Sequence, residues 1–264
     1  MMKSLLRKLA AAIVLGAFSL PAIAAEKLVV GAYPSNPPWE AKNEKGEFEG
    51  FEVDLVKAIA KKLNRDVDIQ DLGFQALFAA TSSGRIDVAI STITITPERL
   101  KSQAFTQPYY DSDMALAAAN ETPLKGLSDV KGKTLGALAT STGETWIKDN
   151  MQKYGIAGIK TYNTQQDLLL DTRNGRVDGA ISDLAGMQFT FQKMPGLKIV
   201  ERIPTGDRYG IMMKKGSPLL EPVSNAITEL KKDGTLAALH KKWLGVDPEP
   251  TTSTVTVAPV PNAM

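Results

Sequence analysis

From Lys27 onward, hydrophobic and polar positions follow two alternating patterns. Short apolar runs, such as Leu28 to Val30 and Val88 to Ile90, are typical of buried strands. Between such runs, apolar residues recur at helical spacing, and the stretch from Phe51 to Leu63 places them on one face of a helix that ends near Asn64. Strands that alternate with helices predict an α/β fold whose sheets are mainly parallel and flanked by helices.

One eight-residue pattern occurs twice. GRIDVAIS begins at Gly84 and GRVDGAIS begins at Gly175. Each copy ends a predicted helix at glycine, turns through charged residues and enters a short apolar strand. Such a motif can recur by chance in an α/β protein, but these copies hold comparable places in two strand-helix-strand series. We interpret them as equivalent steps in two similar lobes.

Two extended apolar runs connect these series, one from Tyr109 to Ala118 and one from Tyr209 to Met213. Two crossings imply that the chain returns to its first lobe, which is then discontinuous in sequence. We therefore expect a first lobe of residues 25–112 and 206–247, a second lobe of residues 113–205, and two crossover strands that act as a hinge. Residues 248–264 are rich in Pro, Thr, Val and Ala, a composition that predicts an unstructured tail.

The first 24 residues have the pattern of a secretory signal. Basic residues at the start precede an apolar run from Leu9 to Leu20 and the small-residue sequence Ala22-Ile23-Ala24. The apolar run is too short to span a bilayer. The sequence thus predicts a cleaved signal peptide, residues 1–24, and a soluble, exported mature chain.

Composition excludes several classes of function. The formal net charge of +2 includes Lys3, Arg7 and Lys8 of the signal, so the mature side chains sum to 2 − 3 = −1, which argues against nucleic-acid binding. The chain has no cysteine and one histidine, His240. It also lacks the motifs of zinc peptidases, serine hydrolases and phosphate-binding loops. We expect no metal and no cofactor.

The first segment with candidate chemistry is STITITPER, residues 91–99. Hydroxyl and apolar residues alternate here, so Thr92 and Thr94 lie on one side where the chain leaves a strand, at the end where open α/β sheets bind ligands. Thr96 suits a helix N-cap and Pro97 the first helical position, which places Arg99 in the first turn. A guanidinium at a helix N-terminus is a receptor for a carboxylate. The alternative is an amphipathic edge strand with an ordinary surface arginine.

The second segment is TSTGET, residues 140–145, at the matching place in the other lobe. Ser141 and Glu144 fit a capping box, which is a sufficient structural reason for this sequence. The functional alternative is that Thr142 and Gly143 present a hydroxyl and a free N–H toward the space between the lobes. Asp183 directly follows the second repeated strand, where it is either a helix N-cap or an acidic partner for a cation.

The sequence resembles the bacterial extracellular solute-binding proteins of the polar amino-acid family, family 3. The likeness covers nearly all of the mature chain, and the order of its motifs is highly specific. The matching segments are GFEVDLVKAIAKKL at 50–63, STITITPER at 91–99, AFTQPYY at 104–110, Asp183, YGIMMKKGS at 209–217, and DGT with KWLG between 233 and 245.

The resemblance implies a two-lobed, type II periplasmic binding protein that delivers an amino acid to an inner-membrane ABC permease complex. It implies that Arg99, Thr94 and the backbone N–H of Thr92 hold the ligand's α-carboxylate. Thr142 and Gly143 resemble the carboxylate donors of the second lobe. Asp183 resembles the partner of the α-ammonium group, and Phe74 the aromatic residue that packs on the ligand side chain.

Three positions depart from the family pattern. Some members place an acid where Tyr33 stands, so Tyr33 argues against that way of binding a basic side chain. Asn36 stands where an aromatic residue often packs, which suggests a more polar pocket. Glu144 is an acid at an often neutral position, where it either holds a cationic group or serves its helix N-terminus.

Two other classes of function remain open for a chain of this pattern. One is an exported enzyme on the same fold, dehydratase-like or murein-acting, with Glu144 as the one acid available in the cleft. The other is a sensory receptor domain. We expect a monomeric periplasmic binding protein that is not an enzyme.

Overall fold

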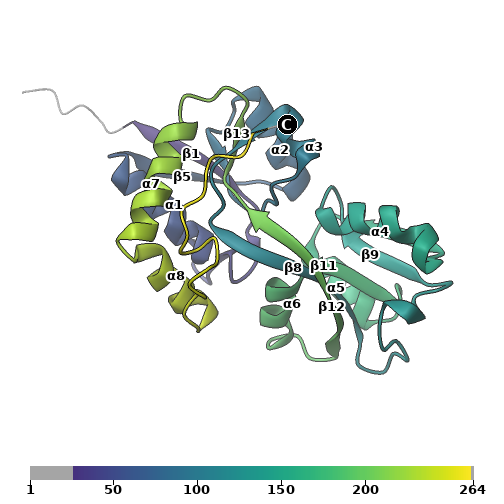
Figure 1. Ribbon diagram of the computed structural model, residues 1–264. Helices are drawn as coiled ribbons and strands as arrows, with labels where there is room; N and C mark the ends of the chain where they lie inside the picture. The colour runs from purple at the N-terminus through teal and green to yellow at the C-terminus, as the bar shows by residue number, and fades with distance from the viewer. Residues whose placement is uncertain (1–25, 263–264) are drawn as a thin grey trace, which may run out of the picture.

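The computed structural model describes residues 26–262, and the predicted signal peptide lies outside this range. The chain folds into two lobes, each built around its own five-stranded sheet (Figure 1). The two-lobed α/β class predicted from sequence is confirmed.

The first lobe combines the start of the chain with its last helices. Its sheet has the strand order β5-β1-β6-β13-β7. The strands are β1 (Lys27–Ala32), β5 (Asp66–Asp71), β6 (Val88–Ala89), β7 (Gln103–Phe105) and β13 (Met212–Lys214). The helices are α1 (Phe51–Lys62), α2 (Phe74–Ser83), α3 (Pro97–Ser102), α7 (Leu220–Lys232) and α8 (Thr235–Leu244).

The second lobe is formed by the middle of the chain, and its sheet has the order β10-β9-β11-β8-β12. The strands are β8 (Tyr110–Ala119), β9 (Thr134–Leu138), β10 (Gly158–Tyr162), β11 (Gly179–Asp183) and β12 (Leu197–Tyr209). The helices are α4 (Thr142–Tyr154), α5 (Gln165–Arg173), α6 (Leu184–Phe191) and the short 3-10 helix η1 (Leu127–Asp129).

Each sheet is mixed and not mainly parallel, which corrects one detail of the prediction. The pairs of β1 with β5 and β6, and of β9 with β10 and β11, are parallel, as expected for strands joined through helices. The remaining pairs are antiparallel because they involve the strands that enter or leave a lobe: β13 in the first sheet and β8 in the second. The antiparallel strands β8 and β12 run side by side between the lobes in Figure 1.

The repeated motif has the same structural role in both lobes. Gly84 and Gly175 end α2 and α5 with φ angles of 76° and 72°, which glycine adopts without strain. Three residues later, Asp87 accepts a 2.8 Å hydrogen bond from the backbone N–H of Val29, and Asp178 accepts one of 2.8 Å from Thr134. Each aspartate therefore ties its turn to the neighbouring parallel strand.

Both faces of each sheet are covered by helices. In the first lobe α1, α7 and α8 pack on one side and α2 and α3 on the other. The predicted stripe of α1 is buried, with Phe51, Leu55 and Ile59 each 0% exposed. In the second lobe α4 covers one face and α5 and α6 the other. Each lobe thus has a hydrophobic core of its own, as expected where helices cover both faces of a sheet.

A small antiparallel sheet lies at the edge of the first lobe. It consists of β2 (Ser35–Asn36), β3 (Glu40–Lys42) and β4 (Phe48–Glu49), which pair in that order. Trp39, next to β3, is fully buried and makes edge contacts with the rings of Phe51, Tyr110 and Tyr209. This packing fixes the β2–β3 segment where the two lobes meet.

The tail predicted to be unstructured is ordered as far as residue 262 and packs along the first crossover, which corrects that prediction. The N–H and hydroxyl of Ser253 donate to the carboxylate of Asp111, and the Thr254 hydroxyl donates to the Tyr109 carbonyl. The buried ammonium of Lys231 donates to the Thr256 carbonyl at 2.9 Å. A composition without large apolar residues is compatible with this structure because the tail is held by hydrogen bonds to buried polar groups.

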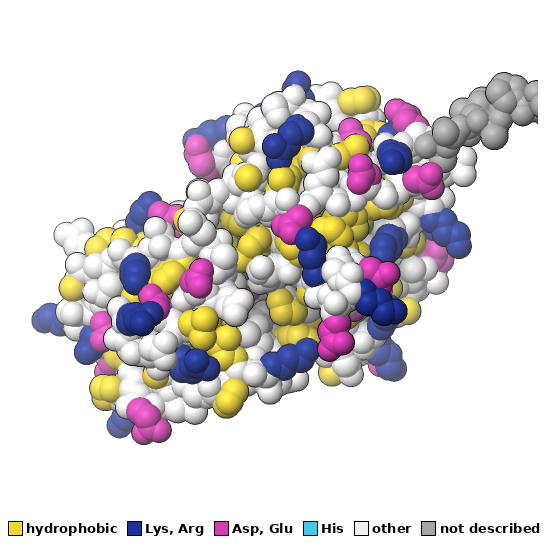
Figure 2. All heavy atoms as spheres, turned by 180° about the vertical axis from the view of Figure 1, so that it is seen from behind, with side chains coloured by type: hydrophobic (Ala, Val, Ile, Leu, Met, Phe, Trp, Pro, Cys, Tyr) yellow, Lys and Arg dark blue, Asp and Glu magenta, His cyan; other side chains and the backbone are white. Residues whose placement is uncertain are grey.

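Surface charge is mixed on the face that Figure 2 shows, where basic and acidic side chains are interspersed. Apolar side chains gather on that face along the boundary between the lobes (Figure 2). Among residues 26–262, no helix is both long and apolar enough to cross a bilayer.

Candidate functional site

A narrow pocket lies between the two lobes and brings together eight of the ten predicted site residues. Its volume is about 30 Å³, the room of one or two water molecules, so the lobes are closed on each other. The predicted residues that line it are Tyr33, Asn36, Phe74, Thr92, Thr94, Arg99, Thr142 and Asp183. Leu138, Ser141, Gln165, Ser182 and Gly186 complete the wall.

Arg99 is positioned by the start of α3, in the geometry expected from the sequence. Thr96 is the N-cap and accepts a hydrogen bond from the Arg99 N–H at 3.2 Å, and Pro97 is the first helical residue. The guanidinium donates to the carbonyl of Thr94 at 2.8 Å and, from the opposite lobe, to the carbonyl of Thr140 at 3.1 Å. It also lies over the ring of Phe78 at 5.1 Å.

The environment of Arg99 lacks a full countercharge. Burial lowers the pKa of its guanidinium to about 10, and the carboxylates of Asp183 and Asp207 offset only part of that effect. Its two hydrogen bonds to carbonyls leave other N–H groups of the five-donor fork available. The site can therefore accept an anion in the pocket.

Asp183 enters the pocket from the second lobe, at the end of β11. It occupies the N-cap position of α6, yet its side chain makes no capping hydrogen bond, so the alternative of an ordinary N-cap is wrong. Its Oδ1 instead accepts a 2.6 Å hydrogen bond from the hydroxyl of Tyr209. Burial raises the pKa of the carboxyl to about 7, and the nearby Arg99 only partly counters this.

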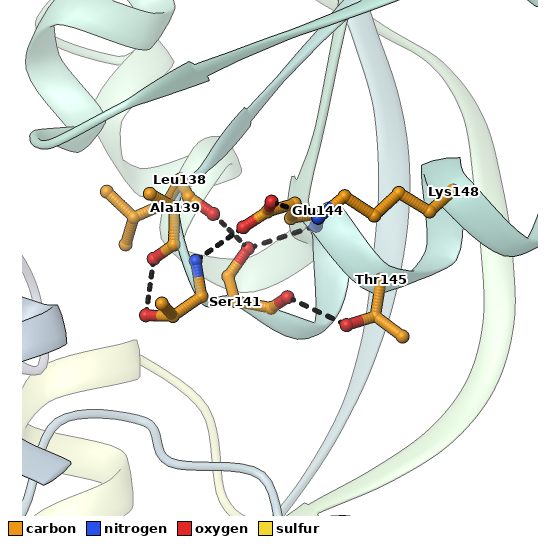
Figure 3. A network of polar contacts seen from close by, with 7 residues as sticks. Leu138, Ala139, Ser141, Glu144, Thr145 and Lys148 are labelled. Carbon is orange, nitrogen blue, oxygen red and sulfur yellow. Dashed lines mark hydrogen bonds and ion pairs between the residues drawn. The ribbon is translucent and has the colours of Figure 1, made fainter.

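Glu144 and Gly143 do not line the pocket, and both have structural roles. Ser141 is the N-cap of α4 and accepts from the Glu144 N–H at 3.2 Å, while the Glu144 carboxylate accepts from the Thr140 N–H at 2.6 Å and pairs with Lys148 (Figure 3). Although partial burial would raise the pKa of Glu144, these two donors lower it. At Gly143 a Cβ atom would lie 2.6 Å from the Ile181 carbonyl, so glycine permits the close packing of α4 on β11.

The other side chains that line the pocket are neutral. Phe74 is 6% exposed and packs edge-on against Phe78, and Tyr33 is 5% exposed. The hydroxyl of Tyr33 accepts a 3.0 Å hydrogen bond from the backbone N–H of Gln165 in the second lobe. Apart from Asp183, no acidic side chain lines this pocket.

One predicted contact is excluded by the structure. The backbone N–H of Thr92 donates to the buried carboxylate of Glu52 at 2.8 Å, so it is not free for a ligand carboxylate. The reason lies in the backbone, because Thr92 has a φ angle of 46°, which is rare for a β-branched residue. The side chain of Thr92 still lines the pocket.

Sequence reasoning missed five residues of the wall. Ser141 was recognised only as a cap, and Ser182 precedes the predicted Asp183 by one position. Gln165, the first residue of α5, had no distinguishing pattern. Its contact with Tyr33 joins positions 132 residues apart, which no local pattern records. Within the described part of the chain, no cluster of His, Cys, Asp and Glu could hold a metal ion.

Comparison with known proteins places this geometry in a family. Residues 28–246 match the family model described as bacterial extracellular solute-binding proteins, family 3. The chain is 31% identical to the ABC transporter arginine-binding protein 1 of Escherichia coli over 246 residues, which cover 90% of this chain and 99% of the relative. It is 33% identical to the L-cystine-binding protein TcyJ of Escherichia coli over 224 residues, 83% of each chain.

Solved structures agree with the sequence comparisons. An ancestral arginine-binding protein bound to arginine has a TM-score of 0.78 and 37% identity, covering 82% of this chain and 97% of its own. The match to the family, residues 28–246, includes both lobes and every residue that lines the pocket. The chain belongs to the bacterial extracellular solute-binding proteins, family 3.

Proposed function

We propose that this protein is a periplasmic receptor that captures one α-amino acid between its lobes and delivers it to an ABC importer. The observation that carries the proposal is the pair of desolvated, opposite charges on opposite lobes: Arg99 and Asp183 line the same pocket. A zwitterion supplies the countercharge that each of them lacks. Its α-carboxylate meets Arg99 and its α-ammonium group meets Asp183.

The energetics favour a zwitterion over a singly charged ligand. Desolvated charges interact strongly when paired and are costly when left unpaired. A simple anion would neutralise Arg99 but leave Asp183 buried, and a simple cation would do the reverse. Thr94 and Thr142 lie in the same wall and supply hydroxyls next to the carboxylate.

We assign the ligand a neutral side chain that can form hydrogen bonds. Beyond Arg99 and Asp183, the pocket is lined by neutral side chains such as Tyr33, Asn36, Phe74 and Gln165, and none of them offers a carboxylate for a guanidinium or ammonium group. Glu144, which sequence left open as a partner for a cation, is engaged by Lys148 and the Thr140 N–H. The relatives named above include both an arginine-binding and a cystine-binding protein, so membership of the family does not fix this choice.

Entry of the ligand requires the lobes to separate. The closed pocket is too small for an amino acid, and Arg99 contacts the Thr140 carbonyl across it. We place the lobe boundaries at residues 112/113 and 205/206, so that β8 and β12 act as the hinge. Periplasmic binding proteins are a standard example of hinge closure around a ligand.

The remaining parts of the proposal concern location and partners. Residues 1–24 are a cleaved signal peptide in this account, and the mature chain acts as a monomer that docks on an inner-membrane permease without binding nucleic acid. It does not turn its ligand over. Recovery of a chemically unchanged ligand after prolonged incubation tests the last point.

A thermal-shift screen of the common amino acids, followed by calorimetric titration of the best ligand, tests the function. Arg99→Ala and Asp183→Asn should each weaken binding by roughly 3 to 5 kcal/mol, because each leaves one ligand charge buried and unpaired. Arg85→Ala and Asp149→Asn, at exposed positions of the two lobes, are matched controls that should bind normally. Unchanged affinity of Arg99→Ala would refute the proposal. If arginine or lysine binds most tightly, only the assignment of a neutral ligand side chain is refuted.

A further inference from the structure

Two buried glutamates lie behind the pocket wall, and the binding chemistry above does not use them. We propose that Glu40 and Glu52 share a single proton and together form the positioning device that holds Asn36 and Thr92 at the ligand. Glu40 comes from β3 and Glu52 from the first turn of α1. The statement about the ligand rests on the proposed function, whereas proton sharing does not.

Burial rules out two independent charges. Both glutamates are 0% exposed, and neither forms an ion pair with a basic side chain in residues 26–262. The two carboxyl groups lie close enough that each affects the pKa of the other. Two neighbouring carboxylates in a desolvated site disfavour each other's charged form, so they are not both ionised.

The hydrogen bonds leave a place for one proton. Oε1 of Glu52 accepts from the Thr92 N–H at 2.8 Å and from the Tyr109 hydroxyl. Oε1 of Glu40 accepts from the Ser91 hydroxyl and from the Asn36 amide at 3.4 Å. The Oε2 atom of each glutamate is buried and has no donor. One proton between the two Oε2 atoms satisfies both, whereas two carboxylates leave both unpaired.

The proton belongs on Glu40. Burial and the neighbouring Glu52 raise the pKa of Glu40 well above its usual range. Burial also raises the pKa of Glu52, but the hydrogen bonds that it accepts from Glu40, Tyr109 and Thr92 oppose the rise. Tyr109 stays a neutral donor because burial and Glu52 raise its own pKa. The pair therefore carries one negative charge, located on Glu52.

This arrangement determines what Asn36 presents to the pocket. Its amide NH₂ group donates both to Glu40 and, at 3.0 Å, to the hydroxyl of Thr92. Its carbonyl oxygen faces Gly186, another residue of the wall, where an added Cβ would lie 3.7 Å away. Asn36 is thus held with an acceptor toward the ligand, which selects for a ligand N–H group.

The same pair holds Thr92 in an unfavourable conformation. A positive φ angle in a β-branched residue is unfavourable and persists only where its surroundings enforce it. The φ angle of Thr92 is 46°. Its N–H is fixed by Glu52 and its hydroxyl by Asn36, so both restraints originate in the glutamate pair.

Three variants test the proposal. In Glu40→Gln the new amide accepts from Ser91 and Asn36 and donates to Glu52, so every hydrogen bond is kept. In Glu52→Gln the new amide donates to Glu40, which then carries the charge. In the double variant the NH₂ groups of the two new glutamines face each other. If one of the two amides turns over to avoid this, either Asn36 or Thr92 loses its hydrogen-bond acceptor. We expect each single variant to bind the best amino acid within about threefold of wild type and the double variant to bind about tenfold or more weakly.

Melting temperature and infrared absorption test proton sharing without a ligand, and therefore independently of the proposed function. Melting temperature should fall steeply only in the double variant, and Glu49→Gln, an exposed change on β4, is the control. At about pH 9, above the pKa of about 7 for Asp183, the infrared C=O band of a buried carboxylic acid should be present in wild type and absent from Glu40→Gln.

Absence of that band in wild type, or a double variant that equals the sum of the single effects in stability, would overturn proton sharing. The infrared and stability tests of proton sharing do not require a ligand. Failure of every variant and of the wild type to bind an amino acid would instead refute the proposed function. A double variant that is destabilised but binds the ligand as wild type does would overturn the positioning role.

Discussion

At the scale of single residues, the proposed function depends on charges that the closed structure leaves incompletely paired. Asp183 accepts from Tyr209, yet its pKa of about 7 means that a proton and a ligand ammonium group compete for the same carboxyl group. Asp207 and Glu52 raise that pKa further, and Arg99 lowers it. We therefore expect ligand binding to be coupled to proton release in a pH range close to neutrality.

We predict that affinity rises from about pH 5 to pH 7 and then levels off. Below pH 7 the free carboxyl is protonated, and the ligand ammonium must displace that proton, so calorimetry at pH 6 in buffers of different ionisation enthalpy should detect release of close to one proton per ligand. At pH 8 the release should be near zero. Asp183→Asn should abolish it, and a wild-type protein that releases no proton at pH 6 would contradict this account.

Sequence predicted the positions of individual residues well where a local pattern fixes the backbone. Arg99 follows from Thr96 and Pro97 because an N-cap and a first-turn proline define the helix start. Thr92 was misassigned as a backbone donor because its positive φ angle depends on Glu52, 40 positions away in the chain. The glutamate pair itself was not predicted, since two carboxyl groups that share a proton leave no signal in spacing.

At the scale of elements, the duplicated motif forms the same helix end and the same strand contact in both lobes. Each copy ends a helix at glycine and then uses an aspartate to bind the first residues of the adjacent parallel strand. The glycine stops and the strands were predictable from the sequence. The aspartate contacts were not, because they join residues 58 and 44 positions apart.

Removal of either aspartate should destabilise its own lobe. Asp87→Ala and Asp178→Ala each leave a half-buried N–H without a charged acceptor, and we expect each to lower the free energy of unfolding by about 1 to 3 kcal/mol. Amide hydrogen exchange should show faster opening of β1 in the first variant and of β9 in the second. Asp66→Ala, exposed on β5, is the control. Equal effects on both lobes from either variant would contradict the local role.

Mixed sheets and the ordered tail mark the limit of element prediction. Apolar runs identify strands but not their direction, so the antiparallel partners of β8 and β13 could not be assigned from the sequence. The tail lacks large buried side chains, and it is held by the half-buried Asp111, which accepts from Ser253, and by the buried Lys231, which donates to the Thr256 carbonyl. The composition of the tail alone does not predict hydrogen bonds to residues elsewhere in the chain.

At the scale of the whole molecule, the lobes meet through few polar contacts. Arg99 reaches Thr140, Tyr33 accepts from Gln165, and Gln75 donates to Asn163 at 3.3 Å. The first two of these contacts involve residues that line the pocket. A ligand that enters must therefore replace part of the contact between the lobes with contacts of its own, so closure and binding are one process in this account.

A crystal structure of the complex with the tightest-binding amino acid tests the central claim most directly. We predict that the ligand lies between the lobes, with its α-carboxylate hydrogen-bonded to the Arg99 guanidinium and its α-ammonium group hydrogen-bonded to Asp183. A ligand bound elsewhere, or one bound between the lobes with either of these side chains turned away from it, would contradict the account.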